Sequence, residues 1–175
     1  MAEPAVSFAR LTDVANDDVV ALLNEPRNAR HMPLAGEPFT AATAADWVAA
    51  KDAQWQRNGY GPWAILLDGE FAGWGGFQAE PDGADLALVL HPRFWGSGAM
   101  VARSMIDAGF AELGLEVVLV ALPYSRRPGP VLARWGFAPD GEATHGGVRF
   151  QRYRLLRDRW TGAQPEGTTR VTGDV

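Results

Sequence analysis

A glycine-containing segment near the middle of the chain has the residue types and spacing of an anion-binding loop. It reads Arg93-Phe-Trp-Gly-Ser-Gly98 and lies between an expected strand and an expected helix. Glycine leaves backbone N–H groups uncovered, and the start of a helix is electropositive, so the segment is suited to a diphosphate. It is not a Walker loop, because no Gly-Lys-Ser/Thr follows, nor a dinucleotide-binding fingerprint, because the third glycine is missing.

Cysteine and histidine usage excludes several other kinds of site. The chain has no cysteine, which rules out a disulfide scaffold, a thiolate metal site and a cysteine nucleophile. The three histidines are scattered along the chain at positions 31, 91 and 145. We therefore expect no metal in the site.

Charge is unevenly distributed along the chain. The net charge of −5 gives no support to nucleic-acid binding. Residues 123–160 carry a net charge of +5 from eight arginines, whereas residues 1–122 carry −9. The arginines have two interpretations, as solvated strand-edge side chains or as the binding surface of a small anionic ligand with an acidic approach for a cationic partner.

The hydrophobic pattern predicts the elements that position these residues. A buried helical face over 99–113, between apolar strands at 85–90 and 116–122, predicts one parallel βαβ crossover. Asp68-Gly69 predicts a hairpin turn, and the glycines at 73, 75 and 76 predict a bulge or a close backbone approach. The remaining predictions are strands at 6–11, 62–67, 71–79, 137–143 and 148–156, helices from Thr12 or Asp13 to Leu23, at 43–57 and at 131–135, and an irregular loop over 24–43.

Length and composition predict a single domain. The 175 residues are 47% apolar and 21% charged, and one core over residues 1–160 accounts for them. Residues 161–175 are poor in large apolar side chains and are expected to be a disordered tail. No apolar run is long enough to span a membrane and the N-terminus shows no secretion signal, so we expect a cytoplasmic protein without a membrane partner.

Four motifs, in order, resemble those of the GCN5-related N-acetyltransferase (GNAT) family. Arg93-x-x-Gly96-x-Gly98-Ala99 resembles its Q/R-x-x-G-x-G/A motif. The longer string from Leu90 to Gly98 is similar to the L-x-P-x-x-W-G-x-G of the ribosomal-protein-alanine acetyltransferase subgroup. Residues 134–137 (RWGF) and 153–160 (YRLLRDRW) resemble the family's K-L-G-F and its closing Y-x-L-x-R-x-x-W.

The resemblance implies a fold and an acyl donor. The fold is α/β (α+β), a mixed, mainly antiparallel sheet of six or seven strands with helices on both faces. Acetyl-CoA, as cosubstrate, lies where two parallel strands splay apart. The residues implied to bind it are Leu88, Val89, Leu90, Arg93, Trp95, Gly96, Ser97, Gly98, Ala99, Met100 and Ser125.

The resemblance also implies where the two proton transfers take place. Asp85 stands where relatives often carry a glutamate, and we expect it to act as the base or as a substrate anchor. Pro128 stands at the serine of the family's N-x-x-S pattern and has no proton to donate. Tyr124 and Ser125 are the nearest hydroxyls that can protonate the leaving thiolate.

The function implied is acetyl transfer from acetyl-CoA to a primary amine of a small molecule or peptide, by direct attack in a ternary complex. The alternative is a non-catalytic acyl-CoA-binding module, which Pro128 keeps open. Acidic and aromatic residues around the expected acceptor cleft favour an amine over an anionic substrate; they are Glu25, Glu37, Phe39, Trp63, Trp74, Asp85 and Tyr124. The sequence identifies neither the amine nor the acyl length, and a homodimer is compatible with it.

Overall fold

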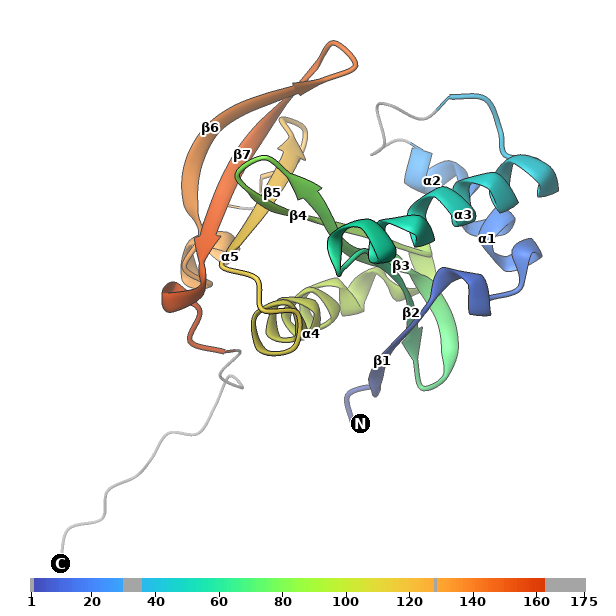
Figure 1. The fold of residues 1–175 in the computed structure, drawn as a ribbon, viewed down its shortest axis with the longest axis horizontal. Coiled ribbons are helices and arrows are strands. Elements are labelled where there is room, and N and C mark those ends of the chain that lie inside the picture. The colour runs from blue at the N-terminus through green and yellow to red at the C-terminus, as the bar shows by residue number, and fades with distance from the viewer. Residues whose placement is uncertain (1, 30–35, 128, 163–175) are drawn as a thin grey trace, which may run out of the picture.

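The computed structural model describes residues 2–29, 36–127 and 129–162, and it contains one mixed sheet (Figure 1). The strands are β1 (Val6–Ala9), β2 (Pro62–Leu67), β3 (Glu70–Glu80), β4 (Gly83–Leu90), β5 (Val117–Pro123), β6 (Ala138–His145) and β7 (Val148–Leu156). The α-helices are α1 (Asn16–Leu23), α2 (Pro26–Ala29), α3 (Ala41–Asn58), α4 (Gly98–Ala111) and α5 (Gly129–Arg134). Short 3₁₀ helices span Leu11–Asp13, Pro92–Ser97 and Arg157–Arg159.

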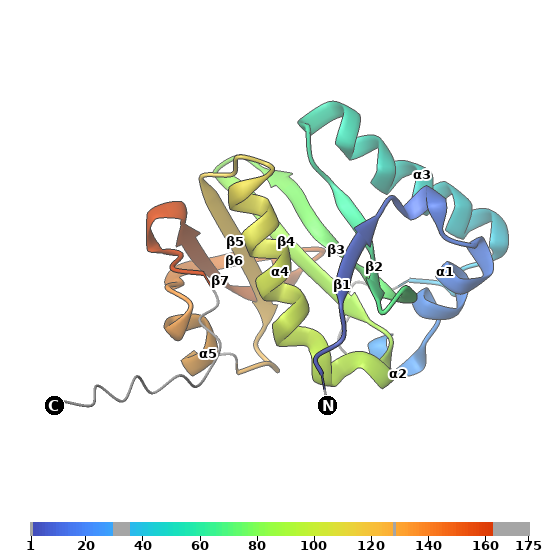
Figure 2. The same ribbon diagram turned by 90° about the horizontal axis from the view of Figure 1, so that it is seen from below.

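The sheet has seven strands in the order β1-β2-β3-β4-β5-β7-β6. Every neighbouring pair is antiparallel except β4 and β5, which α4 connects. One apolar cluster packs α4 against one face of the sheet, and a second packs α1 and α3 against the other (Figures 1 and 2). The predicted mixed, mainly antiparallel sheet with helices on both faces is confirmed.

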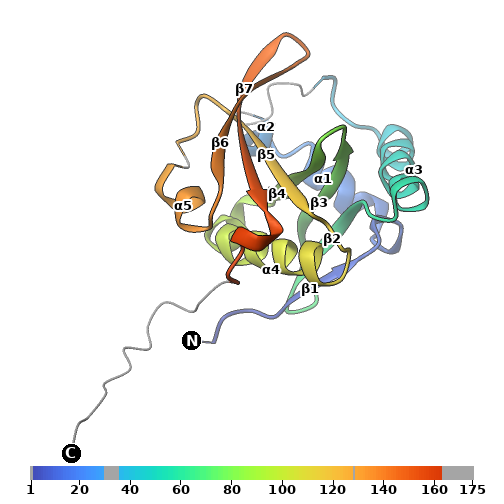
Figure 3. The same ribbon diagram turned by 60° about the vertical axis from the view of Figure 1, so that its left-hand side comes forward.

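The parallel pair is joined over a very short stretch. Only Ala84↔Val118 and Asp85↔Leu119 are in register, although β4 continues to Leu90 and β5 to Pro123. The two strands therefore diverge immediately after Asp85. Beyond β5, the β6–β7 hairpin extends the sheet, and α5 lies beside it (Figure 3).

The glycines of β3 allow this strand to lie unusually close to its neighbours. A Cβ atom on Gly73 would be 2.1 Å from the carbonyl oxygen of Val89, and one on Gly75 would be 2.7 Å from that of Ala87. The predicted close approach is confirmed. The register also shifts here: Ile65 and Leu66 of β2 face Gly73 and Phe71, so the extra residue, Ala72, is in β3 beside Gly73.

Several element boundaries differ from the predictions for local reasons. Helix α1 begins at Asn16 after a separate 3₁₀ turn, so the prediction that Thr12 or Asp13 caps it is wrong. Helix α3 begins two residues early because Thr40 and Thr43 form a capping box. The predicted irregular loop over 24–43 contains α2 and the first turn of α3, and its residues 30–35 lie outside the described ones.

Two further predictions concern residues 161–175 and membrane-spanning helices. Residues 163–175 lie outside the described part of the chain, and the tail prediction therefore stays untested. Within the described ranges, no helix has the length and apolar character needed to cross a membrane.

Candidate active site

A cleft of about 770 Å³ opens where β4 and β5 diverge. One wall is β4 from Asp85 to Leu90, and the opposite wall is β5 from Ala121 to Pro123. Helix α3 and the start of α4 close its two ends, with Lys51 on the first and Gly98 on the second. The predicted cleft between splayed parallel strands is therefore present.

The edge of β4 that faces the cleft has no strand partner beyond Asp85. Backbone N–H and C=O groups on such an edge can pair with an extended ligand as they would with an added strand. Leu88, Val89 and Leu90 all line the cleft here, where the sequence placed the pantetheine arm. Their contact with acetyl-CoA stays a prediction.

The glycine segment forms a 3₁₀ helix that runs directly into α4. Gly98 is the first residue of α4, with φ −58° and ψ −42°, and it lines the cleft together with Trp95. Neither Gly96 nor Gly98 has a positive φ, and a Cβ atom on either would meet nothing within 4 Å. The fold itself therefore does not require glycine here; what glycine provides is open space before the N–H groups of a helix start, which suits a diphosphate.

Other residues of the segment have structural partners. The indole Nε1 of Trp95 donates to the Leu90 carbonyl oxygen at 3.1 Å, which ties the segment to the end of β4. Arg93 pairs with Glu70 and lies over the Phe94 ring. Met100 packs against the core. Arg93, Gly96, Ser97, Ala99 and Met100 are absent from the lining of the cleft, and their role in binding acetyl-CoA is untested.

Asp85 lies at the point where the cleft closes. It occupies the last paired position of the parallel strands, opposite Leu119, and lines the cleft. Burial raises the pKa of its carboxyl to about 7, and the nearby Glu80 adds to this rise. Arg152, the backbone of Ala121 and Lys51 act in the opposite direction. A carboxyl with a pKa near neutrality is suited to accept a proton from an amine.

Lys51 is a cleft residue that the sequence reasoning missed. It lies on α3, and its Nζ donates to Gln78 Oε1 at 2.5 Å. The ammonium also lies 5.6 Å from the centre of the Trp47 ring and 5.0 Å from that of Trp74. Burial lowers the pKa of Lys51, whereas Asp85 raises it. The available signal was the spacing of Trp47 and Lys51, four residues apart and hence on one side of a helix.

Only some of the residues predicted to surround the acceptor amine lie together in the structure. Phe39, Trp74 and Asp85 line the cleft. Trp63 is instead buried in the core, where its ring stacks on Phe8 at 4.6 Å. The remaining predicted contributors, Glu25, Glu37 and Tyr124, are absent from the lining.

The two candidate proton donors lie beyond the end of β5. Tyr124 is 48% exposed, and its hydroxyl donates to a Glu142 carboxylate oxygen, which raises the pKa of Tyr124. Ser125 is exposed, and neither residue lines the cleft, although Arg126 next to them does. Pro128, on which the departure from the family pattern rests, lies outside the described residues. The proton-donor assignments stay predictions.

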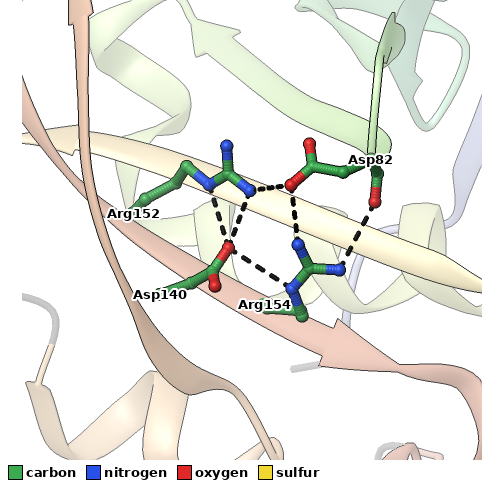
Figure 4. A network of polar contacts seen from close by, with 4 residues as sticks. All are labelled: Asp82, Asp140, Arg152 and Arg154. Atoms are coloured by element: carbon green, nitrogen blue, oxygen red, sulfur yellow. Dashed lines mark hydrogen bonds and ion pairs between the residues drawn. The ribbon is translucent and has the colours of Figure 1, made fainter.

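Part of the arginine excess is used in an ion-pair network near the cleft (Figure 4). Arg152 and Arg154 of β7 both bind Asp82, in the β3–β4 turn, and Asp140 of β6. The network links the β3–β4 turn to the β6–β7 hairpin, so these arginines have structural partners. Within the part of the chain that the structure describes, no three acidic or histidine side chains are grouped to hold a metal ion.

Comparisons with known proteins agree with this architecture. Residues 9–138 match the family model described as an acetyltransferase (GNAT) domain. A relative from Aspergillus fumigatus, named FsC-acetyl coenzyme A-N(2)-transacetylase, is 27% identical over 162 residues, covering 77% of this chain and 67% of its own.

Solved structures show the same fold at low sequence identity. A GNAT acetyltransferase from Bacillus anthracis has a TM-score of 0.69 at 14% identity, covering 90% of this chain and 98% of its own. The aminoglycoside acetyltransferase AAC(6')-Ib, solved with coenzyme A, has a TM-score of 0.67 at 14% identity, covering 89% and 95%. With the family model matching most of the chain, the conclusion is that this protein belongs to the GNAT acetyltransferase family.

Proposed function

We propose that the protein is an N-acetyltransferase that transfers the acetyl group of acetyl-CoA directly to a primary amine. The observation that carries the proposal is the position of Asp85. The parallel strands part directly after this residue, and its carboxyl has a pKa of about 7. A base of that kind at the closed end of the cleft can deprotonate an attacking amine.

The shape of the cleft suggests an orientation for acetyl-CoA, the acyl donor. Its diphosphate is assigned to the start of α4 at Gly98, where the space for it is open. Its pantetheine arm is assigned to the unpaired edge of β4. At about 3.3 Å per residue, the strand from Leu90 back to Asp85 spans about 17 Å, which brings the thioester end toward the carboxylate.

The reaction then requires several proton movements. The Asp85 carboxylate takes a proton from the bound ammonium, which frees the nitrogen lone pair. The nitrogen forms a bond to the thioester carbonyl carbon, and the C–S bond breaks. The new amide nitrogen loses its extra proton to solvent, the thiolate takes up one proton from a donor hydroxyl, and solvent returns a proton to that hydroxyl. We assign the donor hydroxyl to Tyr124 or Ser125; Tyr124 has to give up its bond to Glu142 to supply the proton.

The nature of the acceptor is supported by the relatives. The Aspergillus relative is named as a transacetylase acting at a nitrogen, N(2). Structural neighbours include a spermidine N-acetyltransferase chimera and the aminoglycoside acetyltransferase. Acetyl transfer to a nitrogen is the chemistry that the first two names state, and a primary amine is the acceptor we propose from it. Membership of the ribosomal-protein-alanine subgroup is a narrower proposal, supported by the similarity of residues 90–98 alone.

The test is release of free CoA thiol from acetyl-CoA with a panel of amines. We expect thiol release that depends on both the amine and the protein, with an acetylated amine found by mass spectrometry. Binding of acetyl-CoA with no turnover of any amine would instead support the non-catalytic acyl-CoA-binding module.

A further inference from the structure

The closed end of the cleft, beside Asp85, is where the acceptor amine is expected. Among the described residues there, Lys51 is a cation without an anionic partner. Lys51 bonds to the neutral amide of Gln78, and no described carboxylate lies within ion-pair distance of its Nζ. The acidic group that acts on it is Asp85, whose raised pKa of about 7 means that its charge is fully developed only above neutral pH. A half-buried ammonium that is not paired with a carboxylate can bind the anionic group of a ligand strongly.

Two side-chain hydrogen-bond donors in the neighbouring walls are buried without an acceptor. Asn28 and Trp74 line the cleft, and the Nδ2 of the first and the Nε1 of the second are buried without any acceptor. Buried donors without acceptors are rare in folded proteins, and a functional role is one of the explanations for them. Asp85 is the only carboxylate among the described residues of the lining. These two side chains therefore complement a ligand that brings oxygen acceptors.

The phosphates of acetyl-CoA are not the expected partner of Lys51. Gln78, which binds Lys51, pairs with Asp85 across β3 and β4, at the closed end of the cleft. The diphosphate is assigned to Gly98, beyond the far end of β4, and the strand alone spans roughly 17 Å from Asp85 to Leu90. Of the two ligands of a ternary complex, the acceptor is therefore the better source of an anion for Lys51.

We infer that the acceptor is an amino-acid-type molecule whose carboxylate is bound by Lys51 while its amine lies against Asp85. The inference rests on the proposed function and narrows its substrate class. The rings of Phe39, Trp47 and Trp74 form the wall beside Lys51, with Trp47 and Trp74 edge to face at 5.2 Å. They favour an apolar or aromatic body between the amine and the carboxylate. Lys51 disfavours diamines, whose second cation it would repel.

The test compares two acceptors that share an amine and a ring and differ in a carboxylate, phenylalanine and phenethylamine. For the wild-type protein we expect the lower acceptor KM with phenylalanine. Lys51→Met keeps the apolar stem against the tryptophan rings and removes the charge. It should raise the KM for phenylalanine about 10- to 100-fold, the loss of one charge-assisted hydrogen bond, and leave phenethylamine nearly unchanged.

A control variant and a binding measurement complete the test. Arg57→Met removes an exposed cation from the same helix outside the cleft lining and should leave both KM values unchanged. Titration calorimetry should show 3-phenylpropanoate, which has no amine, binding to the wild type more tightly than to Lys51→Met.

The outcomes separate this inference from the proposed function. Turnover of phenethylamine at or below the KM of phenylalanine, unaffected by Lys51→Met, would refute the inference and leave the N-acetyltransferase intact. A fall in kcat with both acceptors and unchanged KM would also refute it, because Lys51 would then act on the thioester. Turnover of no amine at all would refute the proposed function and the inference with it.

Discussion

Replacing Asp85 by asparagine should abolish most of the activity and yet make the folded protein more stable at alkaline pH. The substitution keeps the size of the side chain and removes the carboxylate that we assign as the acceptor of the amine proton. A general base contributes about 10²- to 10⁴-fold to the rate, and we expect kcat to fall by that amount. Binding of acetyl-CoA should be retained, because the carboxylate is not expected to contact its diphosphate.

The gain in stability follows from the raised pKa. Below pH 3.8 the carboxyl is protonated in the folded and unfolded chain alike, and its ionisation costs the fold nothing. Between pH 3.8 and about 7 the unfolded chain loses the proton while the folded chain keeps it, so stability falls as pH rises. A difference of roughly 3 units between the folded and unfolded pKa corresponds to about 4 kcal/mol in the free energy of unfolding. The wild-type protein has lost this stability above pH 7, whereas Asp85→Asn keeps it because asparagine does not ionise.

Two assays check these expectations. In the wild type, kcat/KM should rise tenfold per pH unit up to an inflection near pH 7, because the base acts only when ionised, and Asp85→Asn should lack that inflection. Urea unfolding should show the stability of Asp85→Asn relative to wild type increasing from pH 4 to pH 8. A variant with kcat within a few-fold of wild type and the same inflection would refute the assignment of Asp85 as the base.

Three further substitutions test other parts of the structure. Tyr124→Phe should lower kcat by ~10²-fold with acetyl-CoA affinity unchanged if this hydroxyl protonates the thiolate; an equal loss in Ser125→Ala alone would move the role to the serine. Gly73→Ala should cost roughly 3 kcal/mol in urea unfolding, because its Cβ would lie 2.1 Å from the Val89 carbonyl oxygen; wild-type stability would contradict the close approach of β3 and β4. Asp82→Asn should lower Tm at pH 7 in low salt, with a smaller difference in 1 M salt, because it breaks half of the arginine network; no change in Tm at low salt would contradict a stabilising network.

Much of the fold followed from short-range patterns in the sequence. Asp68 and Gly69 specify the hairpin with φ values of 49° and 81°, which few other residue types accept. The helix between two apolar strands specified the crossover that makes β4 and β5 parallel. The start of α1 was mispredicted because Leu11 is buried on a separate 3₁₀ turn, and this packing overrides a favourable cap at Thr12 or Asp13.

The site was predictable only where a single segment forms it. The region around Gly98 and the open edge of β4 are each contiguous, and the motif located both. Lys51 lies near Asp85 because α3 packs across the sheet and because Lys51 bonds to Gln78, which pairs with Asp85. These are contacts between segments far apart in the chain, so no local sequence pattern predicts them. Trp63 was expected at the acceptor cleft, but its ring lies in the core, because side chains along β2 alternate between the two faces of the sheet.

The central claim is that acetyl-CoA lies between β4 and β5 with its diphosphate at the start of α4, and titration calorimetry of one pair of variants tests it most directly. Gly98→Val fills the open space before the helix, whereas Ala111→Val places the same side chain on the exposed far end of the same helix. We predict at least a 100-fold loss of acetyl-CoA affinity in Gly98→Val, with wild-type affinity in Ala111→Val and unchanged circular dichroism in both. Wild-type affinity in a folded Gly98→Val variant would contradict the account.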